Sequence, residues 1–143
     1  MYQRWIVALC ALAVCGPAFA AGRLVVEHAW IRAAPPGARM LAGYATLRNV
    51  GDAPLVVTGA ESPDFGDVSL HQTVEDNGVE RMRPLGEVEI APGASVELSP
   101  GGKHLMLMQP KRELGAGDKA SIRMTLANGG SASTDFEVRE TAP

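Results

Sequence analysis

Turn-forming residues divide most of this chain into short segments. Glycine, proline and asparagine gather at Pro35-Pro36-Gly37, Asn49-Val50-Gly51, Asn77-Gly78, Pro92-Gly93, Pro100-Gly101-Gly102 and Asn128-Gly129-Gly130. Segments of this length between such turns are typical of β-strands and leave little room for amphipathic helices. The spacing of the turns therefore predicts an all-β fold.

The segments between the turns also have the composition of strands. Ile122, Met124 and Leu126 alternate with polar residues, as expected where one face of a strand is buried. About eight to ten short strands at this spacing predict one compact domain, either a β-sandwich or a small barrel. The predicted strands are Leu24–Arg32, Gly43–Asn49, Leu55–Gly59, Val68–Val74, Val79–Pro84, Val88–Ile90, Ser95–Leu98, His104–Met108, Ala120–Ala127 and Ser133–Arg139.

The first twenty residues differ from the rest and are predicted to be a signal peptide. Arg4 precedes the apolar run Trp5–Val14, and Ala18-Phe19-Ala20 has the small-x-small pattern of a cleavage site. The expected division is a cleaved signal peptide at 1–20 and an exported domain at 21–143. An uncleaved membrane anchor is an alternative that the short apolar run disfavours.

Both cysteines, Cys10 and Cys15, fall within this predicted signal peptide. Lipid attachment at Cys15 is a minor alternative, because Val14 is larger than the residue that usually precedes a lipidated cysteine. The predicted mature domain has no thiol, which excludes disulfides and thiol redox chemistry. A metal site in this domain would have to use histidine, methionine or carboxylate ligands.

Charge and hydropathy exclude other classes of function. The formal net charge is −3 and no basic cluster occurs, which argues against nucleic-acid binding. No second apolar run is long enough to span a bilayer, so no membrane span is expected after signal cleavage. No nucleophile–histidine pair or carboxylate pair indicates an enzyme, and nothing demands more than a monomer.

A predicted hairpin brings one histidine and one methionine together. Asn77-Gly78 is a strong signal for a two-residue loop, which would place Thr73 opposite Met82. His71 and Met82 would then share one face of the hairpin as diagonal neighbours, with Cα atoms about 7–8 Å apart. A register shift of one residue would move Met82 to the other face.

A second pair follows in His104-Leu105-Met106, where residues two apart on a strand point the same way. The two pairs could together supply two imidazoles and two thioethers. Thioethers favour Cu(I) over hard cations, and imidazole suits copper in either oxidation state, so Cu(II) stays open. Outside these pairs a histidine or methionine is usually structural; this interpretation applies to His28, Met40, Met108 and Met124, with Met40 and Met108 as reserve ligands.

At these residues the sequence resembles the PCuAC family of periplasmic chaperones for the Cu(A) site of cytochrome c oxidase. The family motif is His, ten residues, Met, twenty-one residues, His, one residue, Met, and His71, Met82, His104 and Met106 match every spacing. The resemblance extends over most of the predicted domain, through Ala29–Ala33, Pro35-Pro36-Gly37, Gly43-Tyr44, Leu47–Asn49, Met82-Arg83-Pro84 and Pro100–Leu107.

The resemblance implies a cupredoxin-like Greek-key β-sandwich that binds one Cu(I) through His71, Met82, His104 and Met106. It also implies delivery of copper in the periplasm toward cytochrome c oxidase assembly, with the Cu(A) domain and Sco-type thiol proteins as partners. Ser69 stands where relatives commonly have an acidic residue, which alters the local charge but removes no ligand. No His/Met-rich segment follows residue 139, so a second, tail-borne copper site is not expected.

Three other functions remain open at this stage. A copper-tolerance or storage protein would need the same ligands as a chaperone. An electron-transfer cupredoxin is disfavoured, because a blue-copper site requires a cysteine thiolate. A metal-free binding module would show no affinity for copper at all.

Overall fold

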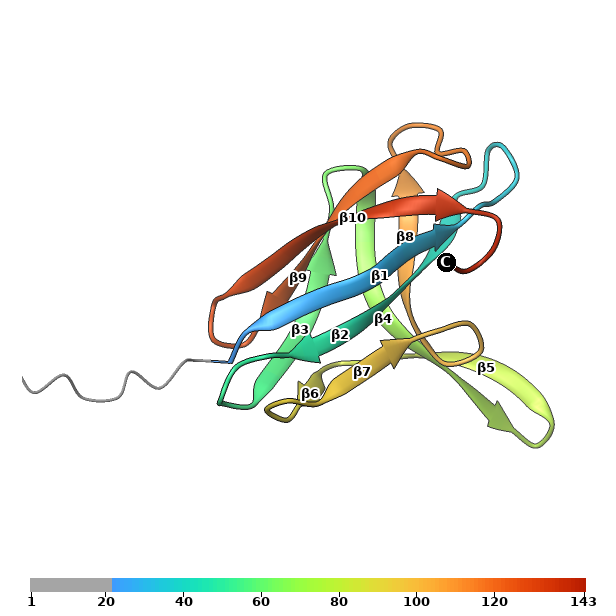
Figure 1. Ribbon diagram of the computed structural model, residues 1–143. Coiled ribbons are helices and arrows are strands. Elements are labelled where there is room, and N and C mark those ends of the chain that lie inside the picture. The colour runs from blue at the N-terminus through green and yellow to red at the C-terminus, as the bar shows by residue number, and fades with distance from the viewer. Residues whose placement is uncertain (1–21) are drawn as a thin grey trace, which may run out of the picture.

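The computed structural model describes residues 22–143, which contain ten strands and no helix (Figure 1). This confirms the predicted all-β class. The predicted signal peptide, with both cysteines, lies outside the described residues and stays a prediction. The strands are β1 (Leu24–Arg32), β2 (Met40–Asn49), β3 (Leu55–Glu61), β4 (Phe65–Asp76), β5 (Val79–Pro84), β6 (Val88–Ile90), β7 (Ser95–Leu98), β8 (Lys103–Pro110), β9 (Lys119–Leu126) and β10 (Ser131–Arg139).

Some strands are longer than the sequence predicts, and pairing with a neighbouring strand explains the difference. β2 begins at Met40, three residues before the expected start, because its first residues pair with the end of β8. β4 is longer at both ends: Phe65 pairs with Pro110 of β8, and Asp76 pairs with Val79 of β5. Backbone hydrogen bonding to a neighbouring strand thus extends a strand beyond the residues whose composition marks it.

The strands form one continuous sheet in the order β5-β4-β8-β2-β1-β10-β9-β3-β6, with β7 paired to the second half of β2. The first and last strands, β1 and β10, pair in parallel, whereas the remaining pairs among residues 22–143 are antiparallel. β3 also contacts β4, although five strands separate them in the sheet order. The sheet therefore folds back on itself and encloses the core between two layers.

Alternation along β8 separates the core face from a second face that bears polar and sulfur groups. Leu105 and Leu107 are fully buried in the core. The alternate residues Met106 and Met108 point the other way and are only half-buried. Met124 on β9 is fully buried, as predicted for a core methionine.

Candidate metal centre

The β4–β5 hairpin has the register that the sequence predicts. Thr73 pairs with Met82 and His71 pairs with Pro84. Asn77 and Gly78 both have positive φ angles, 52° and 77°, as a two-residue loop of type I′ requires. His71 and Met82 therefore lie on the same face of the hairpin, because residues two apart on a strand share a face.

The pairing of β4 with β8 brings the two predicted halves together. His71 lies directly opposite His104, and Ser69 lies opposite Met106. The two imidazole rings are nearly parallel, with centroids 6.1 Å apart and 26° between their planes. Two histidines separated by thirty-two residues thus meet as one cross-strand pair.

The hydrogen bond of His104 leaves one ring nitrogen available. The side chain is only 5% exposed, and its Nδ1 lies 3.1 Å from the carbonyl oxygen of Gly102. A carbonyl can only accept, so Nδ1 carries the proton and the neutral ring keeps a lone pair on Nε2. That Nε2 is buried and has no hydrogen-bond partner within residues 22–143.

His71 has a comparable arrangement with the two nitrogens exchanged. Its Nε2 lies 3.0 Å from Oγ of Ser69, while its Nδ1 is buried without a hydrogen-bond partner in the described part of the chain. When Nε2 carries the proton and donates this hydrogen bond to the Ser69 hydroxyl, the lone pair is on Nδ1. A hydrogen bond at one ring nitrogen that fixes the other as a ligand is the arrangement found in most histidine metal sites.

Burial lowers the pKa of His71 below its ordinary value of 6.5. The facing His104 lowers this pKa further, because two imidazolium ions in this position would repel each other, while the Asp67 carboxylate acts in the opposite direction. The net effect favours the neutral imidazole, which is the form that binds a metal ion.

The two predicted methionines lie in different surroundings. Met106 is half-buried on β8, in the interior of the sheet. Met82 is 56% exposed on β5, which is an edge strand. Both line a pocket of about 220 Å³ together with His104.

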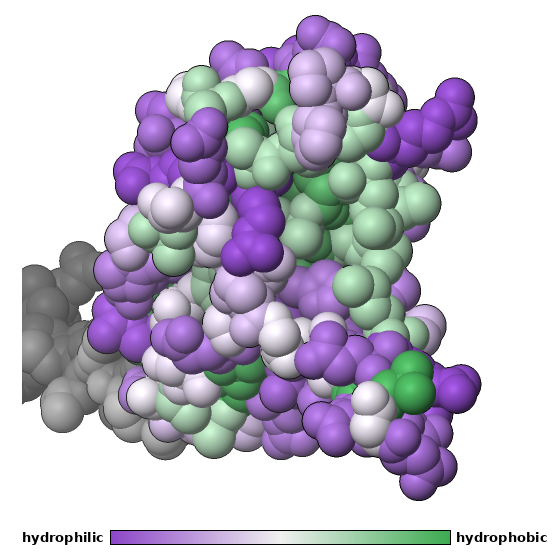
Figure 2. All heavy atoms as spheres, turned by 90° about the vertical axis from the view of Figure 1, so that its right-hand side faces the viewer, coloured by the Kyte–Doolittle hydropathy of each residue, from purple (hydrophilic) through white to green (hydrophobic). Residues whose placement is uncertain are grey.

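The rest of this pocket is mainly apolar. Its lining includes apolar residues just after β1 and at the start of β2, namely Ala33, Ala34, Pro35, Leu41 and Ala42. Figure 2 shows the side of the molecule that carries the β4–β5 hairpin at its lower end, and apolar residues form a hollowed band above that end. An apolar lining lowers the local dielectric and limits access of water to a bound ion.

One cation lies at the margin of this pocket. The Cζ of Arg32 lies 5.9 Å from the ring centroid of Trp30 and 5.8 Å from that of Tyr44, and the two rings are 4.9 Å apart. The guanidinium is therefore held over two aromatic faces, a favourable contact that fixes it beside the site.

The donors gathered at the site are nitrogen and sulfur. No group of three or more His, Cys, Asp or Glu side chains that could hold a metal ion occurs among residues 22–143. His28, not expected to be a ligand, is exposed at a bulge of β1, with a φ of 53°. Met108 pairs with Met40 across β2 and β8 but does not line the pocket.

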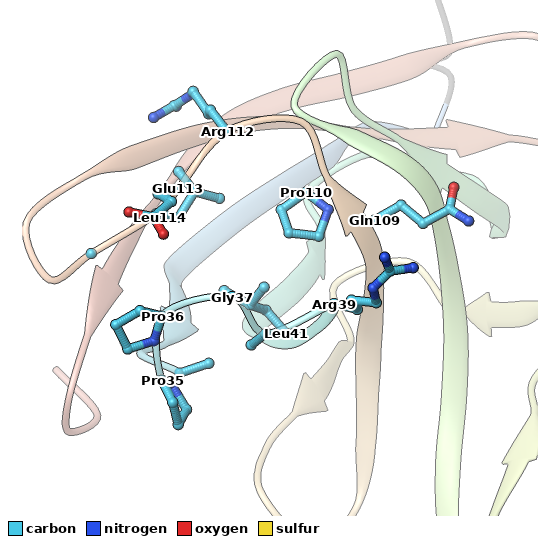
Figure 3. A pocket seen from close by; sticks show the side chains of 13 residues that line it. Pro35, Pro36, Gly37, Arg39, Leu41, Gln109, Pro110, Arg112, Glu113 and Leu114 are labelled. Carbon is cyan, nitrogen blue, oxygen red and sulfur yellow. The ribbon is translucent and has the colours of Figure 1, made fainter.

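A larger pocket of about 420 Å³ lies next to this one but differs in chemistry (Figure 3). Pro35, Pro36 and Gly37 form one side, and the segment through Glu113 and Leu114 lies opposite. Its lining contains no histidine or methionine. This pocket is larger than the one that Met82 and Met106 line, but it has no ligand for a soft metal ion.

The sequence did not reveal two contributors to the candidate site, Ser69 and the Gly102 carbonyl, and indicated a third, Met40, only as a reserve ligand. Ser69 was noted only as a lost acidic residue, yet its hydroxyl contacts His71. The Gly102 carbonyl belongs to the turn Pro100-Gly101-Gly102, and a turn motif does not predict that one of its carbonyls will bind the ring of His104. Met40 was kept in reserve, and the structure places it in the lining of the same pocket as Met82.

Comparison with known proteins agrees with the resemblance seen in the sequence. The family described as "Putative lipoprotein LpqE-like" matches residues 24–138. The chain belongs to this family. The LpqE-like family is part of the PCuAC group, so the predicted membership of PCuAC is confirmed.

Two curated relatives of this LpqE-like chain share 34% identity with it. "Putative lipoprotein Lxx21020" of Leifsonia xyli aligns over 116 residues, which are 80% of this chain and 69% of the relative. "Uncharacterized protein RP573" of Rickettsia prowazekii aligns over 80 residues, which are 55% of this chain and 44% of the relative.

Solved PCuAC domains share the fold. The copper-bound PCuAC domain from PmoF2 is 26% identical with a TM-score of 0.68, and the match covers 87% of this chain and 97% of that domain. The CuI-DR1885 structure from Deinococcus radiodurans is 29% identical with a TM-score of 0.67, over 87% of this chain and 83% of that one. The predicted cupredoxin-like β-sandwich is therefore confirmed.

Residues 22–143 contain no helix that is long and apolar enough to cross a membrane.

Proposed function

We propose that this chain is a periplasmic copper metallochaperone, not an enzyme, that binds one Cu(I) and delivers it toward the assembly of cytochrome c oxidase. His71, Met82, His104 and Met106 are the proposed ligands. The observation that carries the proposal is the facing pair of imidazoles, each with one unpartnered buried nitrogen, beside a pocket lined by thioethers.

The donor chemistry supports Cu(I) as the cargo. Two neutral imidazoles and two thioethers add no negative charge, which suits a soft monovalent ion better than a hard divalent one. The copper-bound PmoF2 domain and CuI-DR1885 are similar to this chain in fold and sequence, which supports copper binding here. The lowered pKa of His71 keeps a nitrogen lone pair available near neutral pH.

Delivery is supported by the position of Met82. Its thioether lies on an edge strand whose residues are all exposed, so an approaching protein can reach it without unfolding the sheet. An acceptor with thiolate ligands, such as a Cu(A) domain or a Sco-type protein, binds Cu(I) more strongly than neutral donors do. Transfer of Cu(I) from this chain to such an acceptor is therefore thermodynamically favourable. A storage role, which needs the same ligands, is the alternative.

Export to the periplasm is part of the proposal. It is supported by the predicted signal peptide and by the relatives described as putative lipoproteins. Mass spectrometry of the protein from the cell envelope distinguishes the two modes of processing. Cleavage before Ala21 yields an unmodified mature chain, whereas a lipid on Cys15 yields a larger mass.

The metal site is tested by titration of the mature protein with Cu(I) in competition with a chromophoric Cu(I) chelator, followed by X-ray absorption spectroscopy. We expect one equivalent to bind, with both nitrogen and sulfur scatterers. Wild-type affinity in His71→Ala and Met106→Ala variants, or a shell of oxygen alone, would contradict the ligand assignment.

Delivery is tested separately from binding. The Cu(I)-loaded protein is mixed with an apo Cu(A) domain or a reduced Sco-type protein, and the copper content of both is measured after separation. Copper on the acceptor supports the chaperone function. Copper retained despite an acceptor of higher affinity favours storage.

A further inference from the structure

A third methionine lies at the proposed copper site without a role in it. Met40 begins β2 and lines the same pocket as Met82, Met106 and His104. Its side chain is 47% exposed, in contrast to the fully buried core residue Met124. Core packing therefore does not explain this side chain.

Strand register fixes where Met40 points. Ala42 of β2 pairs with Met106 of β8, and Met40 pairs with Met108. Met40 and Met106 are thus diagonal neighbours on one face, a position from which long side chains can meet. The small side chain of Ala42, between them on β2, leaves space over the sheet at this point.

The other residues that line the pocket offer a soft ion no further ligand. They are alanines, one proline, one leucine and Arg32, whose cation cannot coordinate a metal. The donors are therefore three thioethers and the imidazole of His104. Two of the thioethers, on Met40 and Met82, are about half exposed, so they lie on the side from which an ion would enter.

We propose that Met40 is an accessory Cu(I) ligand that forms a three-thioether entry site with Met82 and Met106. This inference rests on the proposed function. On release, copper moves from the histidines to this entry site: a Cu–S bond to Met40 forms as a Cu–N bond to a histidine breaks. On loading, the same ligand exchange runs in reverse. Copper remains Cu(I) and the imidazole keeps its lone pair, so the exchange requires no oxidant, reductant or proton.

The equilibrium test uses Ag(I), a soft monovalent ion that does not change oxidation state under these conditions. In a His71→Ala/His104→Ala variant both imidazoles are absent, and we expect one Ag(I) to bind weakly by isothermal titration calorimetry. Adding Met40→Leu should weaken this binding about tenfold or more. Loss of a group that only supports a ligand lowers metal affinity by about 10–100-fold, and loss of a ligand itself should lower it at least as much. Met108→Leu is the matched control, because Met108 pairs with Met40 but does not line the pocket.

The kinetic test keeps both histidines and so does not depend on the folding of the double variant. Removal of Cu(I) by an excess of chelator is followed by stopped-flow absorbance in wild type, Met40→Leu and Met108→Leu. We expect release to slow about threefold or more in Met40→Leu only, with a smaller change in equilibrium affinity, because both uptake and release use the entry site.

The two proposals fail in different ways. Wild-type protein that binds neither Cu(I) nor Ag(I) would overturn the copper function and this inference together. Wild-type protein that binds Cu(I), with Met40→Leu indistinguishable from Met108→Leu in both tests, would overturn the role of Met40 and leave the copper function intact.

Discussion

β8 and β5 each supply one methionine to the proposed copper site, but they lie in opposite surroundings. β8 is an interior strand, paired with β4 on one side and β2 on the other. β5 is an edge strand, paired with β4 only, and all six of its residues are exposed. The same donor chemistry is thus presented once from the rigid part of the sheet and once from its edge.

The difference separates two requirements of a carrier. The proposed ligands on β8 are held in place because Leu105, between His104 and Met106, is fully buried in the core. A ligand on β5 can move or exchange at little cost, since few buried contacts hold an edge strand in place. β8 therefore orients the proposed site, and β5 makes it accessible.

The largest effect should come from the core residue beneath the site. Leu105→Ala removes a fully buried side chain from β8 and should lower the free energy of unfolding by about 2–5 kcal/mol. Val79→Ala in the exposed β5 should change it by less than about 0.5 kcal/mol. Urea unfolding of the apoprotein measures both, and equal losses would refute the contrast between the strands.

The second prediction compares ligands on the two strands. His104→Ala should weaken Cu(I) binding by roughly 100-fold or more, because it removes an oriented ligand, whereas outer-shell changes alone cost about 10–100-fold. Met82→Leu should weaken binding less and leave stability unchanged, because its side chain is exposed. Chelator competition gives the affinities. A greater loss for Met82→Leu than for His104→Ala would reverse the assigned roles.

A smaller effect is expected from the group that holds His71. Ser69→Ala removes the hydroxyl 3.0 Å from Nε2 and should lower Cu(I) affinity by about tenfold, because the ring and its tautomer are no longer fixed. Ser95→Ala, at an exposed position of β7, is the control and should have no effect. Unchanged affinity in Ser69→Ala would mean that packing alone orients the ring.

The smallest effect concerns pH and the apoprotein. The pKa of His71 is lowered in the folded state, so below about pH 6.5 the unfolded chain takes up more protons at this residue than the folded one does. The free energy of unfolding should therefore fall as the pH falls from 6.5 toward the folded-state pKa. Urea unfolding at pH 7.5 and 5.5 should show a shallower loss in His71→Gln than in wild type. A loss of equal size would assign the effect to other groups.

Much of this architecture could be predicted from local sequence. The turn residues and alternating apolar positions gave the all-β class, and four strands, including Val79–Pro84, have the predicted bounds. The register that places Met82 opposite Thr73 followed from Asn77-Gly78, because a two-residue loop fixes the pairing on both sides. The spacing of the four predicted ligands also pointed correctly to the PCuAC family.

The remainder depended on pairings between distant segments. Composition could not show that β8 inserts between β4 and β2, and that insertion sets His71 against His104 and brings Met40 into the pocket. It also could not assign Ser69 and the Gly102 carbonyl as partners of the imidazoles. Turns and the alternation of apolar and polar residues along a strand follow from local backbone geometry, so the local sequence is enough to predict them. Which strands become neighbours is decided by burial of the whole sheet, because only the assembled core selects one pairing among many that the local pattern allows.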